Sequence, residues 1–184
     1  MVPYNNGVSF GKVVRFLLSD FNTVEVLNLE ATDGDLKGFA GGFTDGVYGY
    51  VVPFHSGARF GKVARFLLSD FNTVEVLNLE ATDGDLKGFI GGFTDGAYGY
   101  VVPYNNGAYF GKVARFLLSD FNSVEVLNLE ATDGDVKGFV DGFTDGAHGY
   151  VVPYYNGAYF GKVVRFQVTP TVAPSAKRRR RRMR

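Results

Sequence analysis

Three acidic motifs recur along the chain, and their residue types are the ones best suited to chemistry. Each motif reads Asp-Gly-Asp and is preceded three residues earlier by a glutamate. Carboxylate oxygens at this spacing suit Ca²⁺, although no copy matches the twelve-residue EF-hand loop or a nonapeptide calcium repeat. The alternative is an Asx-type turn, in which the aspartates accept hydrogen bonds from backbone N–H groups. The candidate calcium ligands are Asp33, Asp35, Asp83, Asp85, Asp133 and Asp135.

A second group of candidate site residues lies in a turn where the copies of a repeat differ most. Tyrosine and asparagine side chains in loops suit recognition of a glycan or a protein loop, since tyrosine combines a flat apolar ring with a polar hydroxyl. The alternative is neutral variation at exposed loop tips. The candidate binding residues are Tyr4, Asn5, Asn6, Phe54, His55, Arg59, Tyr104, Asn105, Tyr109, Tyr154, Tyr155 and Tyr159.

The parts of a nucleophilic active site are missing from the sequence. There is no cysteine, and His55 and His148 stand at non-equivalent positions of the repeat. The carboxylates recur with the repeat, which indicates a structural role rather than one acid–base pair. We therefore expect a protein that is not an enzyme, and an enzyme that uses the acidic motifs as a metal site ranks last.

These residues must be positioned by a repeat of 50 residues, of which residues 37–86 are one full copy. Only nine positions differ between residues 1–50 and 51–100. Turn-forming residues divide each copy into four segments with strand character, here 38–46, 48–54, 61–68 and 73–79. The first segment is rich in glycine, which indicates close approach of another backbone. No apolar stripe with helical period runs for three turns, so helix is not expected.

The third segment predicts how the copies pack. Val63 and Leu67 share one face of this strand, and Ala64 and Phe66 share the other, so both faces are apolar. A sheet with two apolar faces buries both when copies of it stack face to face. In the equivalent segment of the first copy, Lys12 and Arg15 point to opposite faces, and we expect Arg15 to pair with Glu25 on the neighbouring strand.

Four antiparallel strands in a repeat of this length predict an all-β, propeller-like array of about three and a half repeats in residues 1–168. A β-trefoil also has three four-stranded repeats, but it explains neither the extra partial copy nor the doubly apolar strand. The count falls short of the usual four to eight blades. We expect an open arc, a ring completed by two copies, or missing flanking sequence, and an open arc would favour self-association.

The sequence GKVARFLLSDFNTVEVLNL at residues 61–79 resembles the outer hairpin of YncE-like and kelch-like propeller blades. The whole unit also resembles tandem repeats encoded in algal and protist genomes. Gly41 and Gly42 give only a loose match to the kelch double glycine, and the WD dipeptide is absent. The resemblance implies repeat type and says little about activity, because propellers host unrelated functions.

The net charge of the chain is zero, but the basic residues are concentrated at the C-terminus and the rest of the chain is acidic. Seven of the 19 basic residues lie at the C-terminus, which leaves 12 basic against 19 acidic residues elsewhere. We expect residues 169–184 to be a flexible linker and a basic tail. If the chain binds nucleic acid, we expect the basic tail to be the only part that does so. No apolar run is long enough to span a membrane. The basic residues of the tail are Lys177, Arg178, Arg179, Arg180, Arg181, Arg182 and Arg184.

These observations predict a non-enzymatic scaffold that presents aromatic, amide and acidic loop residues to a protein or a glycan. The alternative is a structural or adhesive segment of a longer repeat array, with calcium as a stabilising ion. No other cofactor is indicated by the sequence.

Overall fold

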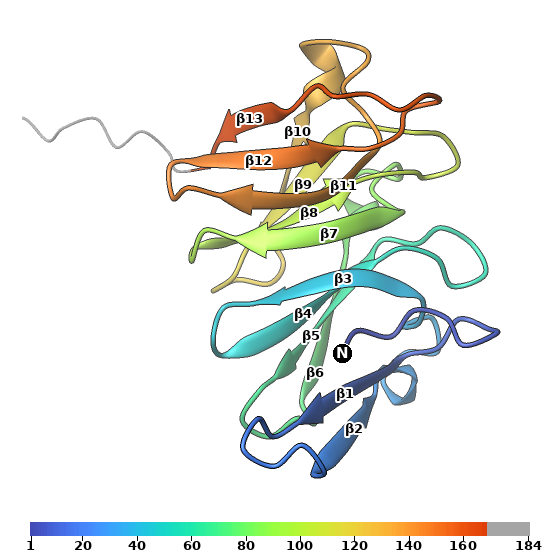
Figure 1. Cartoon of the computed structure of the whole chain (residues 1–184), viewed down its shortest axis with the longest axis vertical. Helices are drawn as coiled ribbons and strands as arrows, with labels where there is room; N and C mark the ends of the chain where they lie inside the picture. Colours follow the sequence, from blue (N-terminus) through green and yellow to red (C-terminus); the bar gives the residue numbers. More distant parts are fainter. Residues whose placement is uncertain (169–184) are drawn as a thin grey trace, which may run out of the picture.

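The computed structural model describes residues 1–168, and within them the chain is all-β, with four antiparallel sheets. The predicted linker and basic tail, residues 169–184, lie outside the described part. The sheets follow one another along the long axis of the molecule in chain order (Figure 1). We call them sheets I to IV, and we call the contact between two successive sheets a seam.

The strand bounds show one sheet for each copy of the repeat. Sheet I holds β1 (Lys12–Phe16) and β2 (Val24–Asn28). Sheet II holds β3 (Phe39–Thr44), β4 (Tyr48–Pro53), β5 (Lys62–Leu67) and β6 (Val74–Asn78). Sheet III holds β7 (Phe89–Thr94), β8 (Tyr98–Pro103), β9 (Lys112–Leu117) and β10 (Val124–Asn128). Sheet IV holds β11 (Phe139–Thr144), β12 (His148–Pro153) and β13 (Val164–Gln167).

The four predicted strands of the repeat are therefore confirmed in sheets II and III, where strand order follows chain order. A short 3-10 turn follows each outermost strand, at η1 (Leu29–Ala31), η2 (Leu79–Ala81) and η3 (Leu129–Ala131). Within residues 1–168, no helix is long and apolar enough to cross a membrane.

The first residues of the chain are equivalent to residues 51–53 of β4, so the repeat predicts a strand there. Residues 1–4 form no strand, although Met1 and Val14 exchange backbone hydrogen bonds, with N–O distances of 2.6 and 3.3 Å. Sheet I has no first strand to hold this segment on its other side, so only one residue pair is made. Sheet I thus contains only the third and fourth strands of the repeat.

The hydrophobic core is divided into three clusters, one at each seam. Val13 and Leu27 of sheet I pack with Val51 and Phe66 of sheet II, and equivalent clusters join sheets II and III and sheets III and IV. Within sheet II, Val63 belongs to the seam with sheet III, whereas Ala64 and Phe66 belong to the seam with sheet I. The prediction that the third strand is buried on both faces is confirmed.

Glycine lets the innermost strands of successive sheets approach closely. A Cβ atom added to Gly41 of β3 would lie 2.9 Å from the Cα atom of Gly91 in β7, and one added to Gly91 would lie 2.9 Å from the Cα atom of Asp141 in β11. Both glycines also have positive φ, +95° and +75°. The expectation that glycine marks a close backbone approach is thus confirmed.

Candidate functional site

The variable turn between the second and third strands is a tight hairpin in every copy. Its ends are joined by the bridges Asn5–Ser9, His55–Arg59, Asn105–Tyr109 and Tyr155–Tyr159. The glycine two residues after the first bridge position has positive φ in each copy, for example +124° at Gly107. In two copies, an asparagine Oδ1 accepts a hydrogen bond from this glycine N–H. The Asn-x-Gly sequence therefore fixes the turn locally.

A row of aromatic rings crosses all four copies at the end of the second strand. The ring centroids of Tyr4 and Phe54 are 5.9 Å apart, those of Phe54 and Tyr104 are 6.1 Å apart, and those of Tyr104 and Tyr154 are 6.2 Å apart. Phe54 is buried in this row, while Tyr4 and Tyr154 at its two ends are exposed. Of these four predicted contact residues, Phe54 thus supports its neighbours and presents little surface of its own.

A second row of side chains lies beside the first. Tyr109 packs edge-on against Tyr104 and Tyr155, with centroid distances of 5.6 and 5.2 Å. Tyr159 packs in the same way against Tyr154 at 5.7 Å and is largely exposed. We call these two rows, from Tyr4 to Tyr159, the aromatic rim.

Arg59 occupies the position in the second row that Tyr109 and Tyr159 take in later copies. Its guanidinium carbon lies 4.1 Å from the ring centroid of Phe54. Burial among the rings lowers the pKa of Arg59 from its ordinary value, and burial likewise raises the pKa of the neighbouring Tyr104. The rim therefore contains one cation stacked among rings that are themselves held in fixed positions.

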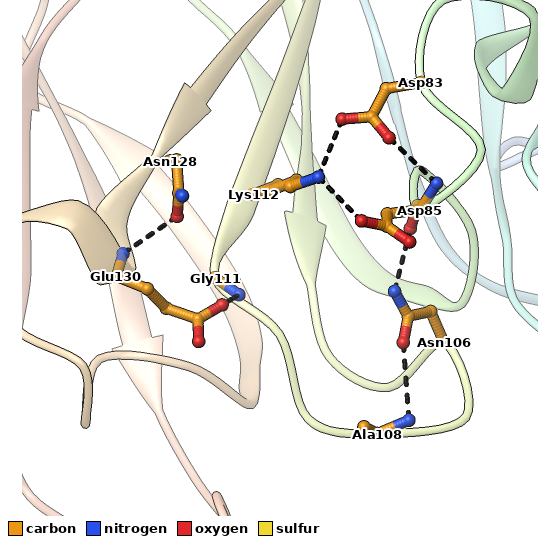
Figure 2. A network of polar contacts seen from close by, with 8 residues as sticks. All are labelled: Asp83, Asp85, Asn106, Ala108, Gly111, Lys112, Asn128 and Glu130. Atoms are coloured by element: carbon orange, nitrogen blue, oxygen red, sulfur yellow. Dashed lines mark hydrogen bonds and ion pairs between the residues drawn. The ribbon is translucent and has the colours of Figure 1, made fainter.

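The acidic motifs meet the same rim. The side-chain amide of Asn106 donates to the backbone carbonyl of Asp85 at 3.1 Å, and Asn156 makes the same bond to Asp135 at 2.8 Å. Figure 2 shows Asn106 reaching from its turn to the acidic loop. The variable turns and the acidic loops are thus joined into one continuous edge of the array.

A lysine from the next sheet lies between the two aspartates of each acidic loop. Lys112 Nζ is 2.8 Å from Asp83 Oδ2 and 2.7 Å from Asp85 Oδ2 (Figure 2). Lys62 binds Asp33 and Asp35, and Lys162 binds Asp133 and Asp135, in the same manner. We call this contact the lysine clamp.

The remaining acidic groups of the loop are directed to backbone N–H groups. Asp83 Oδ1 accepts from the N–H of Asp85 at 3.0 Å, which is the Asx-type turn. The glutamate of this loop, Glu80, accepts from the N–H of Gly61 at 2.8 Å, and Glu130 of the next copy makes the same bond to Gly111 at 2.7 Å (Figure 2). The hydrogen bond from Lys112, and then that from the backbone, lowers the pKa of Asp83.

This geometry favours the Asx-turn interpretation of the acidic motifs over calcium binding. The ammonium group of Lys112 lies where a cation between the carboxylates would lie. Among residues 1–168, no group of three or more acidic or histidine side chains is arranged to hold a metal ion.

A second polar contact crosses each seam near the other end of the third strand. Arg65 donates to Glu75 on the adjacent strand at 2.8 Å, and also to the backbone carbonyl of Leu118 in sheet III at 2.8 Å. Its guanidinium carbon is 4.3 Å from the ring centroids of both Tyr48 and Phe121. The predicted pair of Arg15 with Glu25 is confirmed at 2.8 Å. We call the contact of Arg65, and of the equivalent arginines, with the next sheet the arginine bridge.

Sequence reasoning missed both cross-seam contacts, although a signal for them was present. Lysine and arginine stand at fixed positions in all four copies of the third strand, as charged residues in segments that are otherwise mostly apolar. The sequence does not show that the lysine reaches back to the preceding sheet and the arginine forward to the following one. The two histidines, His55 and His148, lie on sheets II and IV and are not brought together.

No protein-family model and no curated protein sequence matches the chain.

Proposed function

We propose that the chain is a non-enzymatic binding scaffold with propeller-like stacking of its sheets, and that the aromatic rim contacts a protein loop or a glycan. The observation that carries the proposal is the gathering of aromatic rings, mostly tyrosine, from all four copies on one edge, with Tyr4, Tyr154 and Tyr159 exposed.

The rim has the physical properties of a recognition surface. Each turn is fixed by its own hydrogen bonds, so little conformational entropy is lost when a ligand binds. Tyrosine offers apolar area and a hydroxyl at low entropic cost, which suits the faces of sugar rings as well as peptide loops. Asn5 and Asn105 add amide groups beside the rings at the turn tips.

The test compares a rim variant with a matched aromatic variant elsewhere. The double variant Tyr155→Ala and Tyr159→Ala should lose ligands that the unchanged chain retains in a glycan array or a protein pull-down. Phe21→Ala is the control, because Phe21 is an exposed ring in the turn between β1 and β2, away from the rim. Retention of nothing by the unchanged chain, or equal retention by the rim variant, would overturn the proposal.

A second candidate function is a structural segment that associates with further copies of itself. Val163 of sheet IV is 64% exposed, whereas the equivalent Val113 is 2% exposed because sheet IV covers it. Phe21 of sheet I is 74% exposed, whereas the equivalent Phe71 is 6% exposed. Among the described residues, no sheet covers the seam residues on the outer faces of sheets I and IV. A second copy would supply such a sheet by head-to-tail stacking.

Sedimentation velocity over a range of concentrations tests this second candidate. Val163→Glu should shift the chain towards monomer, while Val47→Glu, at an exposed turn between β3 and β4, should not. A monomer at every concentration would refute self-association. Binding of nucleic acid through the basic tail remains a prediction, since the tail lies outside the described residues.

A further inference from the structure

Within residues 1–168, no strand occupies the outermost position of sheet IV. In sheet II, Lys62 and Val63 at the start of β5 pair only with β6, opposite Asn78 and Leu77. Sheet IV has no fourth strand among the described residues, and β13 accordingly starts two residues later, at Val164. The backbone at residues 162–163 is therefore without the ladder partner that its counterparts have.

A groove with an apolar floor runs beside this open edge. A cavity of about 210 Å³ lies between β10 and β13, where the apolar residues Val126, Leu127 and Phe166 line it together with the ion pair of Arg115 and Glu125. It continues into a second hollow of about 450 Å³ that shares Leu127 and Phe166.

Leu127 shows what is missing from the groove. Its counterpart Leu77 is only 6% exposed and belongs to a cluster on which Val124, from the fourth strand of the next sheet, also packs. Leu127 itself is 42% exposed. The groove is therefore the place where the fourth strand of a complete sheet would lie.

The positive charge of Arg165 at the edge of β13 favours a strand that carries a carboxylate. In the three other copies, the arginine of the third strand binds a glutamate of the fourth strand, with N–O distances of 2.8, 2.8 and 2.7 Å. Arg165 is the fourth of these arginines, and it has no carboxylate partner among the described residues. A strand added here would satisfy the pattern if it placed a carboxylate opposite Arg165.

The sequence that follows β13 does not have the pattern of a fourth strand. At the positions equivalent to Val74 and Glu75 it has Pro174 and Ser175, and Ala176 is followed by lysine and arginine. Proline lacks the N–H that a ladder needs, and the basic residues would repel Arg165. Residues 169–184 therefore do not carry the chemistry that matches this edge.

We propose that the open edge of β13 binds an extended acidic and apolar segment of another polypeptide by strand addition. The register of sheet II sets the ligand: glutamate opposite Arg165, and valine opposite Phe166 and Val164, as Glu75, Val74 and Val76 lie opposite their partners. Backbone hydrogen bonds supply affinity, and the groove and the arginine supply specificity. This site is separate from the aromatic rim and does not depend on the function proposed for it.

The probe is a labelled peptide of residues 72–79, which carries the chain's own fourth-strand sequence, and the protein is the full 184-residue chain. Fluorescence anisotropy should show saturable binding. Arg165→Glu should weaken binding by about tenfold, because a charge pair is replaced by a repulsion. A peptide with lysine in place of Glu75 should bind the unchanged chain weakly and regain affinity for Arg165→Glu.

Two further variants keep the test specific to the groove. Lys12→Glu makes the same charge change on an exposed third-strand residue of sheet I, and it should leave binding unchanged. Leu127→Lys should weaken binding while Arg165 is intact. Circular dichroism checks that each variant is folded. We expect the two charge changes at Arg165 and Lys12 to leave the fold intact, because both side chains are exposed. No saturable binding by the folded chain, or equal binding by Arg165→Glu, would overturn the proposal.

Discussion

Replacing Arg65 by alanine should destabilise the fold much more than the same change at Arg165, although both residues occupy the same position of the repeat. Arg65 is 8% exposed and bridges sheets II and III. Arg165 is exposed, and no following sheet covers it among the described residues. The pair therefore isolates the contribution of the arginine bridge from the intrinsic effect of removing an arginine.

The magnitude follows from the contacts of Arg65. A charged hydrogen bond to the Leu118 carbonyl contributes about 1.5–3 kcal/mol, and contacts with two rings contribute roughly 0.5–1 kcal/mol each. The pair with Glu75 adds at most about 1 kcal/mol, because that carboxylate is 42% exposed. Desolvation of the guanidinium opposes these gains, and its Nε has no hydrogen-bond partner. We expect a net loss of about 2–3 kcal/mol for Arg65→Ala, against less than about 0.5 kcal/mol for Arg165→Ala.

Thermal unfolding followed by circular dichroism measures this difference. For a chain of this size, each kcal/mol lowers Tm by roughly 2–4 °C, so Arg65→Ala should lower Tm by about 5–10 °C. Equal shifts for the two variants would show that the bridge between sheets contributes nothing, and the reasoning about the seam would fail.

Three further predictions concern the other contacts of the seams. Lys112 lowers the pKa of Asp83. The ionised carboxylate therefore stabilises the fold at pH values above its ordinary pKa, and this stabilisation is lost as the pH falls through the lowered pKa. Lys112→Met should make Tm fall less in acid, whereas Lys12→Met should not change the fall. Gly91→Ala should destabilise by at least about 2 kcal/mol in urea unfolding, whereas Gly96→Ala should cost about 1 kcal/mol. Both glycines have positive φ, but only Gly91 has backbone atoms of a neighbouring strand within 3 Å of the added Cβ. Millimolar calcium or a chelator should leave Tm unchanged, because a lysine lies between the aspartates; a rise with calcium would restore the metal interpretation.

The strands could be predicted from the sequence because local signals determine them. The segment predicted at residues 61–68 became β5 (Lys62–Leu67), and the one at 73–79 became β6 (Val74–Asn78). Their ends are set by turn residues, and their two faces by alternation of side chains, both of which are visible within a few residues. Packing of sheet on sheet followed from the apolar residues on both faces of β5.

The polar contacts across the seams could not be predicted in the same way. The lysine clamp joins residues 27 and 29 apart, and the arginine bridge joins residues 53 apart. Such distances in the chain become contacts only through the spacing and rotation of neighbouring sheets, which the sequence of one copy does not encode in an obvious form. The burial of Phe54 was missed for the same reason, since rings from two other copies of the repeat, Tyr4 and Tyr104, pack against it.

The near-identity of the copies has a consequence for how the chain reaches its native state. β5 and β9 have the same sequence, as do β6 and β10. A pairing of β5 with β10 would therefore have the same register and the same side-chain neighbours as the native pairing with β6. The two pairings differ in the length of the loop between the paired strands. The native hairpin closes a short turn, whereas the wrong pairing closes a loop that contains a whole repeat and costs more entropy. Correct assembly thus depends on hairpins that close before distant strands meet. Refolding within one molecule competes with exchange of strands between molecules, and low protein concentration should favour refolding within the molecule.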